Sequence, residues 1–148
     1  MAALTAALAV AAGCSNAPTA ADWRRDIAAA RARWTATGIA DYTFSVARSC
    51  NCSASVRPIT VTVVAGAFSS GVYADNTGGA VDTTQYRDFL TVDRLFTYME
   101  QLVDGGPFAF NAEYSSSGIP TSVVVNPQRL VSGEEYSFGV YEFSRSTR

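Results

Sequence analysis

The chain has 148 residues, of which 48% are hydrophobic and 16% are charged, and its formal net charge is −2. This length suits one domain that is large enough to bury a hydrophobic core. All 11 basic residues are arginine, no basic patch gathers them, and histidine is absent. The composition therefore argues against a nucleic-acid partner and removes the commonest general base and metal ligand.

The N-terminus carries an uncharged, alanine-rich run over residues 1–12, which ends in small residues just before Cys14. The run is too short to span a bilayer, which needs about 20 apolar residues, but it suits the apolar region of a secretory signal. Its end resembles a bacterial lipobox, although the usual basic segment is missing because the first arginine is Arg24. We expect a signal peptide at 1–13 and a lipidated Cys14 with a tether at 14–21. The alternatives are an ordinary secretory signal and a buried helix.

A lipid on Cys14 would place the protein in the bacterial cell envelope, anchored to a membrane on the exported side. Each buried methylene of an acyl chain contributes about 0.8 kcal/mol, so two or more chains hold a protein stably. The membrane is therefore the first expected partner.

The first helix is expected from residue 22 to about residue 37, at the start of a single domain that covers residues 22–148. Acidic residues precede arginines along this segment, which suits the helix dipole, and Gly38 is a natural stop. Its apolar residues recur at helical spacing and predict one buried stripe: Trp23, Ile27, Ala30 and Trp34.

Apolar and polar residues then alternate in three stretches, which predicts three strands that each bury one face. These stretches are residues 42–47, 56–64 and 68–74. Ala65 and Gly66 predict a tight turn between the second strand and the third. Three segments lack a strand pattern: the turn-like residues 49–53, the glycine-rich loop 75–80, and residues 81–90.

Two further cysteines, Cys50 and Cys52, form a pair once Cys14 carries lipid, and an oxidising compartment favours a disulfide between them. Residues i and i+2 of a strand lie about 6.6 Å apart, at the far edge of disulfide geometry, so the bridge requires a local bend. The simplest interpretation is a structural clip at a strand end. Thiol exchange and capture of a soft metal are the alternatives, although two thiolates fill only half of a tetrahedral site.

The second helix is expected after Thr91, a typical N-cap, and it should end at Gly105. Its stripe of apolar residues is long: Val92, Leu95, Phe96, Met99, Leu102 and Val103. Three more strands are expected, at 108–114, 121–125 and 135 to about 143. Near Gly139 the alternation changes phase, which a β-bulge would explain.

These elements predict an α+β fold with the order αβββαβββ. Short connections between consecutive strands favour a mostly antiparallel sheet of about six strands. The two amphipathic helices would cover one face of this sheet. The other face would be solvated or would bind a partner.

No catalytic motif stands out. A Gly-x-Ser-x-Gly elbow is absent, and without histidine a serine or cysteine triad cannot form. Four aspartates are explained by capping and solubility: Asp75, Asp82, Asp88 and Asp93. Six tyrosines suggest an aromatic surface, but half-buried strand positions explain most of them: Tyr73, Tyr86, Tyr98, Tyr114, Tyr136 and Tyr141. We therefore expect no enzymatic activity, no cofactor and no bound metal.

The order of several short motifs resembles an uncharacterised family of small bacterial lipoproteins, a domain of unknown function. The motifs are Trp34, Tyr42-Thr43-Phe44, Cys50-Asn51-Cys52, Val61-Thr62-Val63 with Gly66, Leu95-Phe96, and Tyr114 with Gly118-Ile119-Pro120. The acidic pair Glu134-Glu135 before the last strand also fits. The resemblance implies an exported α+β domain without a known activity.

Two functional hypotheses follow from the sequence. The first is a lipid-anchored binding or envelope-associated module, whose protein or cell-wall partner is unknown. The second is a redox or soft-metal-handling protein that uses Cys50 and Cys52. The thiol state of the purified protein would discriminate between them.

Overall fold

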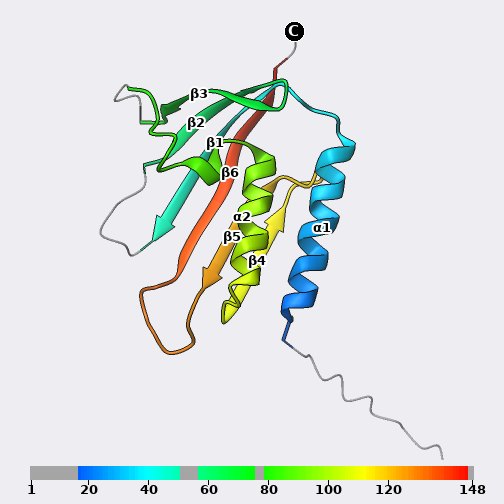
Figure 1. Cartoon of the computed structure of the whole chain (residues 1–148), viewed down its shortest axis with the longest axis vertical. Coiled ribbons are helices and arrows are strands. Elements are labelled where there is room, and N and C mark those ends of the chain that lie inside the picture. The colour runs from blue at the N-terminus through cyan, green and yellow to red at the C-terminus, as the bar shows by residue number, and fades with distance from the viewer. Residues whose placement is uncertain (1–16, 51–56, 76–78, 147–148) are drawn as a thin grey trace, which may run out of the picture.

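The computed structural model describes residues 17–50, 57–75 and 79–146. Within these residues, one antiparallel sheet of six strands has the order β3-β2-β1-β6-β5-β4, and two α-helices cover one of its faces (Figure 1). The elements are α1 Ala20–Ala36, β1 Tyr42–Cys50, β2 Ile59–Val64, β3 Ala67–Tyr73, the 3-10 helix η1 Arg87–Phe89, α2 Val92–Asp104, β4 Ala109–Tyr114, β5 Pro120–Asn126 and β6 Tyr136–Arg145. The expected α+β class and the order αβββαβββ are confirmed.

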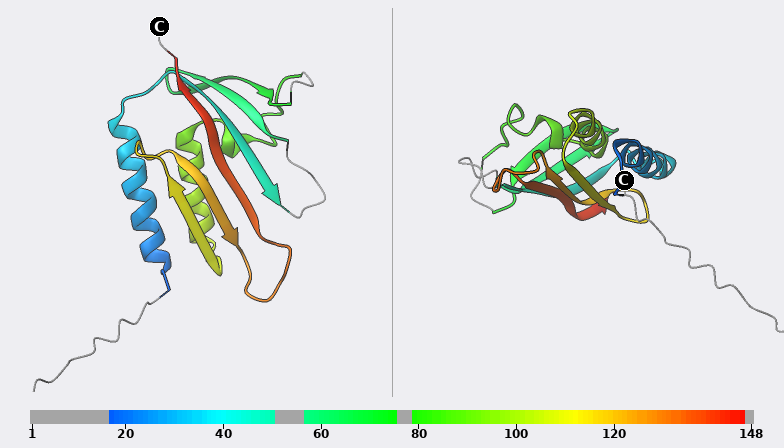
Figure 2. Two further views of the ribbon diagram at one scale, coloured as in Figure 1. Left: turned by 180° about the vertical axis from the view of Figure 1, so that it is seen from behind. Right: turned by 90° about the horizontal axis from the view of Figure 1, so that it is seen from below.

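Each half of the chain is a helix followed by a three-stranded meander, and the pairing of β1 with β6 joins the two meanders. Viewed from below, the helices form one layer and the sheet forms the other (Figure 2). The buried faces of the strands and the apolar stripes of the helices meet between these layers in one hydrophobic cluster. No helix of the described residues lies on the opposite face of the sheet.

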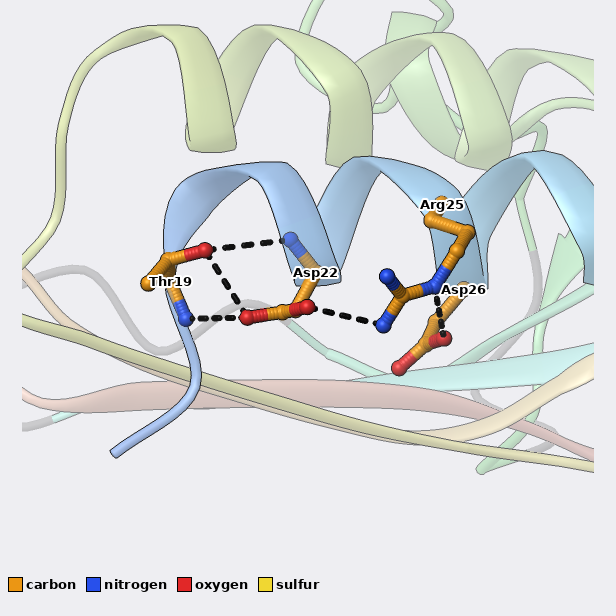
Figure 3. Close-up of polar contacts among 4 residues, drawn as sticks. All are labelled: Thr19, Asp22, Arg25 and Asp26. Carbon is orange, nitrogen blue, oxygen red and sulfur yellow. Dashed lines mark hydrogen bonds and ion pairs between the residues drawn. The ribbon is translucent and has the colours of Figure 1, made fainter. Parts of the chain in front are cut away.

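Helix α1 begins two residues earlier than expected because Thr19 is its N-cap, and Asp22 lies in its first turn. The two residues form a reciprocal capping box, in which the Asp22 N–H donates to Thr19 Oγ1 at 3.4 Å and the Thr19 N–H donates to Asp22 Oδ2 at 2.9 Å (Figure 3). Arg25 donates to Asp22 Oδ1 at 2.8 Å. These hydrogen bonds, that from the Thr19 backbone first, hold the pKa of Asp22 below its usual value.

The buried stripes agree with the sequence pattern on both helices. In α1, Ile27, Ala30 and Trp34 are buried, while Trp23 is only partly buried. In α2, Thr91 is the N-cap as expected, and its Oγ1 accepts from the Arg94 N–H at 3.1 Å. The buried residues of α2 are Val92, Leu95, Phe96, Met99 and Val103.

Strand β1 is longer than expected. Residues 49–53 read as a turn, but Ser49 pairs with Ser137 and Cys50 pairs with Tyr136, so the strand continues to Cys50. The polar side chains of this segment resemble a turn locally, whereas β6 supplies a hydrogen-bonded neighbour that the local pattern does not reveal. Strand β2 begins later than expected, at Ile59, directly after a proline that has no N–H to donate to a ladder.

The expected bulge near Gly139 is wrong in position. The register between β1 and β6 shifts between Thr43 and Ser45, and Glu142 on β6 has a positive φ of 53°. Gly139 has another role, because a Cβ at this position would lie 2.2 Å from the Thr121 carbonyl oxygen. Glycine therefore allows β5 to approach β6 closely on the open face of the sheet.

A glycine allows the turn between β4 and β5 to pack closely against α1. Gly118 has a φ of +87°, and a Cβ there would lie 2.1 Å from the Ala30 carbonyl oxygen. Only glycine combines this backbone conformation with so close an approach. The contact positions the first helix beside the second meander.

A buried tyrosine hydroxyl generates a prediction on stability. The ring of Tyr114 stacks with that of Phe96 at a centroid distance of 6.5 Å, but its hydroxyl is buried without a hydrogen-bond partner in the described part of the chain. Replacing an unpaired buried hydroxyl by hydrogen removes a desolvation cost, so Tyr114→Phe should keep the free energy of unfolding at pH 7 or raise it by about 1 kcal/mol. Urea unfolding measures this, and a clear loss would contradict it.

The same residue predicts a pH dependence. Burial raises the pKa of Tyr114 from 10.0 to about 12. The unfolded chain therefore loses this proton first, so the contribution of Tyr114 to stability is constant well below pH 10 and falls as the pH rises toward 12. Urea unfolding between pH 9 and 11.5 should show a steeper loss for the wild type than for Tyr114→Phe. Equal slopes would contradict a raised pKa.

Candidate ligand-binding site around Arg48

The pairing of β1 with β6 brings three chemically distinct side chains together at one end of the sheet. Arg48 and Cys50 lie near the end of β1, and Tyr136 is the first residue of β6, directly opposite Cys50. The guanidinium carbon of Arg48 lies 5.4 Å from the centre of the Tyr136 ring. This distance is typical of a cation–π contact.

Arg48 is half-buried and lacks the partners that such a cation normally has. Its Nε is buried and has no hydrogen-bond partner among the described residues. In the same part of the chain, no carboxylate lies within ion-pair distance of it. A buried donor without an acceptor is costly, so Arg48 stands apart from the paired arginines of this fold.

A hollow of about 340 Å³ opens beside this arginine. Its lining residues come from β1, β6 and the loop between β5 and β6: Arg48, Cys50, Pro127, Gly133, Glu134, Glu135 and Tyr136. Glu135 accepts a hydrogen bond from Asn126 Nδ2 at 2.9 Å, which positions its carboxylate. The hollow thus presents one guanidinium and two carboxylates to a ligand.

The phenol of Tyr136 remains protonated over a wide pH range. Burial raises its pKa above the ordinary value of 10.0, and the neighbouring Tyr98 raises it further. At neutral pH Tyr136 therefore offers a neutral ring to the cation of Arg48. No negative charge from this residue competes with a bound anion.

A second arginine near the site, Arg57, has the partners that Arg48 lacks. Its Nη2 and Nε lie 2.6 and 2.9 Å from the two carboxylate oxygens of Asp75, and its guanidinium carbon lies 3.8 Å from the centre of the Tyr73 ring. The Tyr86 hydroxyl donates to the Arg57 carbonyl oxygen at 2.9 Å. These contacts join the start of β2 to the end of β3, so Arg57 is structural.

The open face of the sheet also contains a hollow, of about 300 Å³, around Gly139. Hydroxyl groups line much of it: those of Ser49, Thr121, Ser122, Ser137 and Tyr141. Nearby, the hydroxyls of Ser45 and Thr60 lie 2.9 Å apart, and Ser45 donates to Glu142 at 3.2 Å. Ser45, Thr60 and Glu142 thus satisfy one another beside this hollow, and Arg48 lines this hollow as well as the one beside Tyr136.

Only some of the residues singled out in the sequence lie together at this site. Cys50 and the pair Glu134-Glu135 line the Arg48 hollow. Cys14 and Cys52 lie outside the described residues, so the lipid and the disulfide remain predictions. Arg48 itself was missed, although a signal was present: its position continues the buried face of β1 after Val46.

The aspartates and tyrosines do not form a site of their own. Asp75 pairs with Arg57 and Asp88 with Arg87, and Asp82 accepts from the Thr84 N–H. In the described part of the chain, no group of three or more potential ligands could hold a metal ion. Most of the tyrosines pack against the core, and among them only Tyr141 is exposed.

None of the described helices is both long and apolar enough to cross a membrane.

Comparison with known proteins gives one positive result, a match of residues 26–145 to a family of unknown function, DUF6174. No curated protein matches the chain, and no solved structure matches it. The family match extends from α1 to the last residue of β6 and includes every residue that lines the Arg48 hollow. The chain therefore belongs to the family of unknown function DUF6174.

Proposed function

We propose that this protein is an exported, lipid-anchored binding module of the bacterial cell envelope, and that its ligand binds in the hollow beside Arg48. The observation that carries the binding role is the half-buried guanidinium of Arg48, whose Nε has no partner in the described structure. Arg57 is paired with Asp75 within the fold, whereas the guanidinium of Arg48 has no ion pair among the described residues and could bind an anionic group of a ligand.

The charges of the hollow indicate the chemical class of the ligand. A guanidinium binds carboxylates through two parallel hydrogen bonds, and the carboxylates of Glu134 and Glu135 favour a cation close by. A ligand with both a carboxylate and an ammonium group satisfies both sides. Amino acids and short peptides have this chemistry, and they are available in a cell envelope.

The anchor is supported by the leader and by its spacing from the domain. The N-cap of α1 is Thr19, only five positions after Cys14. Such a short tether of small residues would hold the domain close to the surface of the membrane. Two or more acyl chains on Cys14 would make this attachment stable.

The anchor predicts a labelling result. In a bacterial host, the wild-type chain should incorporate radioactive palmitate and partition into the detergent phase, whereas Cys14→Ser should do neither. The reason is that no other cysteine follows a lipobox-like sequence. Equal labelling of the two proteins would show that Cys14 is not the lipidated residue.

The binding site predicts a charge-dependent affinity for a simple zwitterion. Alanyl-alanine, titrated into the full-length protein in detergent micelles, should shift the NMR amide signals of Arg48 and Tyr136. Arg48→Gln should weaken this binding about tenfold or more, since a hydrogen bond to a charged group contributes about 1.5–3 kcal/mol. Arg48→Lys should retain part of the affinity because the charge remains.

Matched controls make the result specific. Arg87→Gln removes an exposed arginine that pairs only with its neighbour Asp88 in the described structure, and it should leave binding unchanged. A dipeptide blocked at its carboxylate and a dipeptide blocked at its amine should each bind more weakly than alanyl-alanine. Signal shifts confined to the open face around Gly139, or wild-type affinity in Arg48→Gln, would refute the site.

The redox alternative has one observation in its favour. Arg48 and Cys50 share a face of β1 and line the same hollow, and a neighbouring guanidinium stabilises a thiolate. We nevertheless expect Cys50 and Cys52 to form a structural bridge. The double variant Cys50→Ser, Cys52→Ser should fold, lose about 1–2 kcal/mol of unfolding free energy, and keep dipeptide affinity within twofold.

The thiol state of the protein decides between these two roles. Mass spectrometry of wild-type protein from the envelope should find Cys50 and Cys52 oxidised. Redox titration with glutathione should not reduce the disulfide between Cys50 and Cys52. A bridge that glutathione readily reduces, together with loss of function in a double variant that folds normally, would favour the redox role.

A further inference from the structure

An exposed apolar surface lies at one end of the molecule, on two loops that adjoin each other. It comprises Phe108, Leu130 and Val131, whose exposed fractions are 49%, 93% and 40%, and we call it the apolar tip. The Phe108 N–H donates to the Pro127 carbonyl oxygen at 3.3 Å, which joins the segment before β4 to the loop between β5 and β6. Exposed apolar side chains that gather on adjoining loops indicate a contact surface.

The charge of the apolar tip suits the surface of a membrane. Residues 127–133 contain one arginine and no acidic residue, and the acidic pair Glu134-Glu135 that follows lines the Arg48 hollow. The guanidinium carbon of that residue, Arg129, lies 5.6 Å from the centre of the Phe108 ring. A cation beside exposed aromatic and aliphatic side chains can reach lipid phosphates while the apolar groups enter the headgroup region.

The apolar tip lies at the end of the molecule where the chain enters the domain. In Figure 1 the start of α1, the start of β4 and the loop between β5 and β6 all lie at the lower end. The view from behind in Figure 2 shows the same arrangement. The turn between β2 and β3 and the C-terminus lie at the opposite end.

The length of the tether limits where the membrane can be. Ala20, the first residue of α1, lies six positions after Cys14. A chain of six residues spans at most about 20 Å when fully extended. A lipid on Cys14 would therefore hold the bilayer surface close to the lower end of the domain.

We propose that the apolar tip inserts into the headgroup region of the bilayer that holds the lipid on Cys14. This inference rests on the proposed anchor and extends it, because a second contact fixes the orientation of the domain. Gly133 and Glu134 of the same loop line the Arg48 hollow. The inserted loop therefore places the ligand site beside the membrane surface.

The test uses the full-length, lipidated protein in vesicles of phosphatidylethanolamine and phosphatidylglycerol at a ratio of about 3:1, with brominated acyl chains as quenchers. A tryptophan is introduced by Leu130→Trp, and Val64→Trp is the matched control. Val64 is 39% exposed and ends β2, at the opposite end of the domain. After correction for Trp23 and Trp34, quenching at position 130 should be at least twofold stronger than at position 64.

A second measurement follows the loop of the wild-type protein itself and uses a serine variant as its control. Hydrogen exchange of wild-type residues 128–132 should slow at least threefold when the lipidated protein is bound to vesicles, and the Leu130→Ser, Val131→Ser variant should lose this protection. If Cys14 carries lipid and quenching is equal at positions 130 and 64, the insertion of the tip is overturned while the anchor proposal stands. Protection that appears without vesicles and grows with protein concentration would show contact between two copies and also overturn it.

Mass spectrometry of Cys14 separates the two proposals. If Cys14 carries no lipid, the anchor fails, and this inference fails with it. If Cys14 carries lipid, the quenching and exchange results bear on the apolar tip only.

Discussion

The antiparallel pairing of β1 with β6 is the constraint on which the rest of the structure depends. It joins two meanders that are each continuous in sequence, and it makes one six-stranded sheet of them. One continuous sheet gives the helices a single face to cover, so their apolar stripes bury into one core. The same register sets Cys50 opposite Tyr136 and brings Arg48 over the Tyr136 ring. The candidate site is therefore a consequence of the joint between the two halves.

Local patterns in the sequence were sufficient for most of the elements, because each helix and strand has its own periodicity and its own stop signals. The stripe of α2 and its N-cap at Thr91 are examples. The patterns failed where a distant partner decides the outcome. Ser49 and Cys50 read as a turn but pair with β6, and the irregularity assigned to Gly139 lies at Glu142 instead. Both errors lie on the β1–β6 joint, whose register no local pattern contains.

Arg48 and Arg57 show how the surroundings of a side chain, rather than its type, determine its role. The charge of Arg57 is met by both oxygens of Asp75, so its contacts hold two strands together. Arg48 continues a buried strand face, and its Nε is therefore buried without a hydrogen-bond acceptor among the described residues. Alternation alone could have marked it, since an arginine following Val46 on the apolar face of a strand breaks the pattern. Such a break in a regular pattern is where functional residues are expected.

The geometry of the lower end of the domain links the two proposed contacts. The loop between β5 and β6 carries Leu130 and Val131 at its tip and Glu134 at its base, in the wall of the Arg48 hollow. A membrane contact at the tip and a ligand in the hollow would therefore act on the same loop. Where both favour the same conformation of this loop, attachment to a bilayer would strengthen ligand binding. By thermodynamic reciprocity, a bound ligand would strengthen insertion of the tip to the same extent.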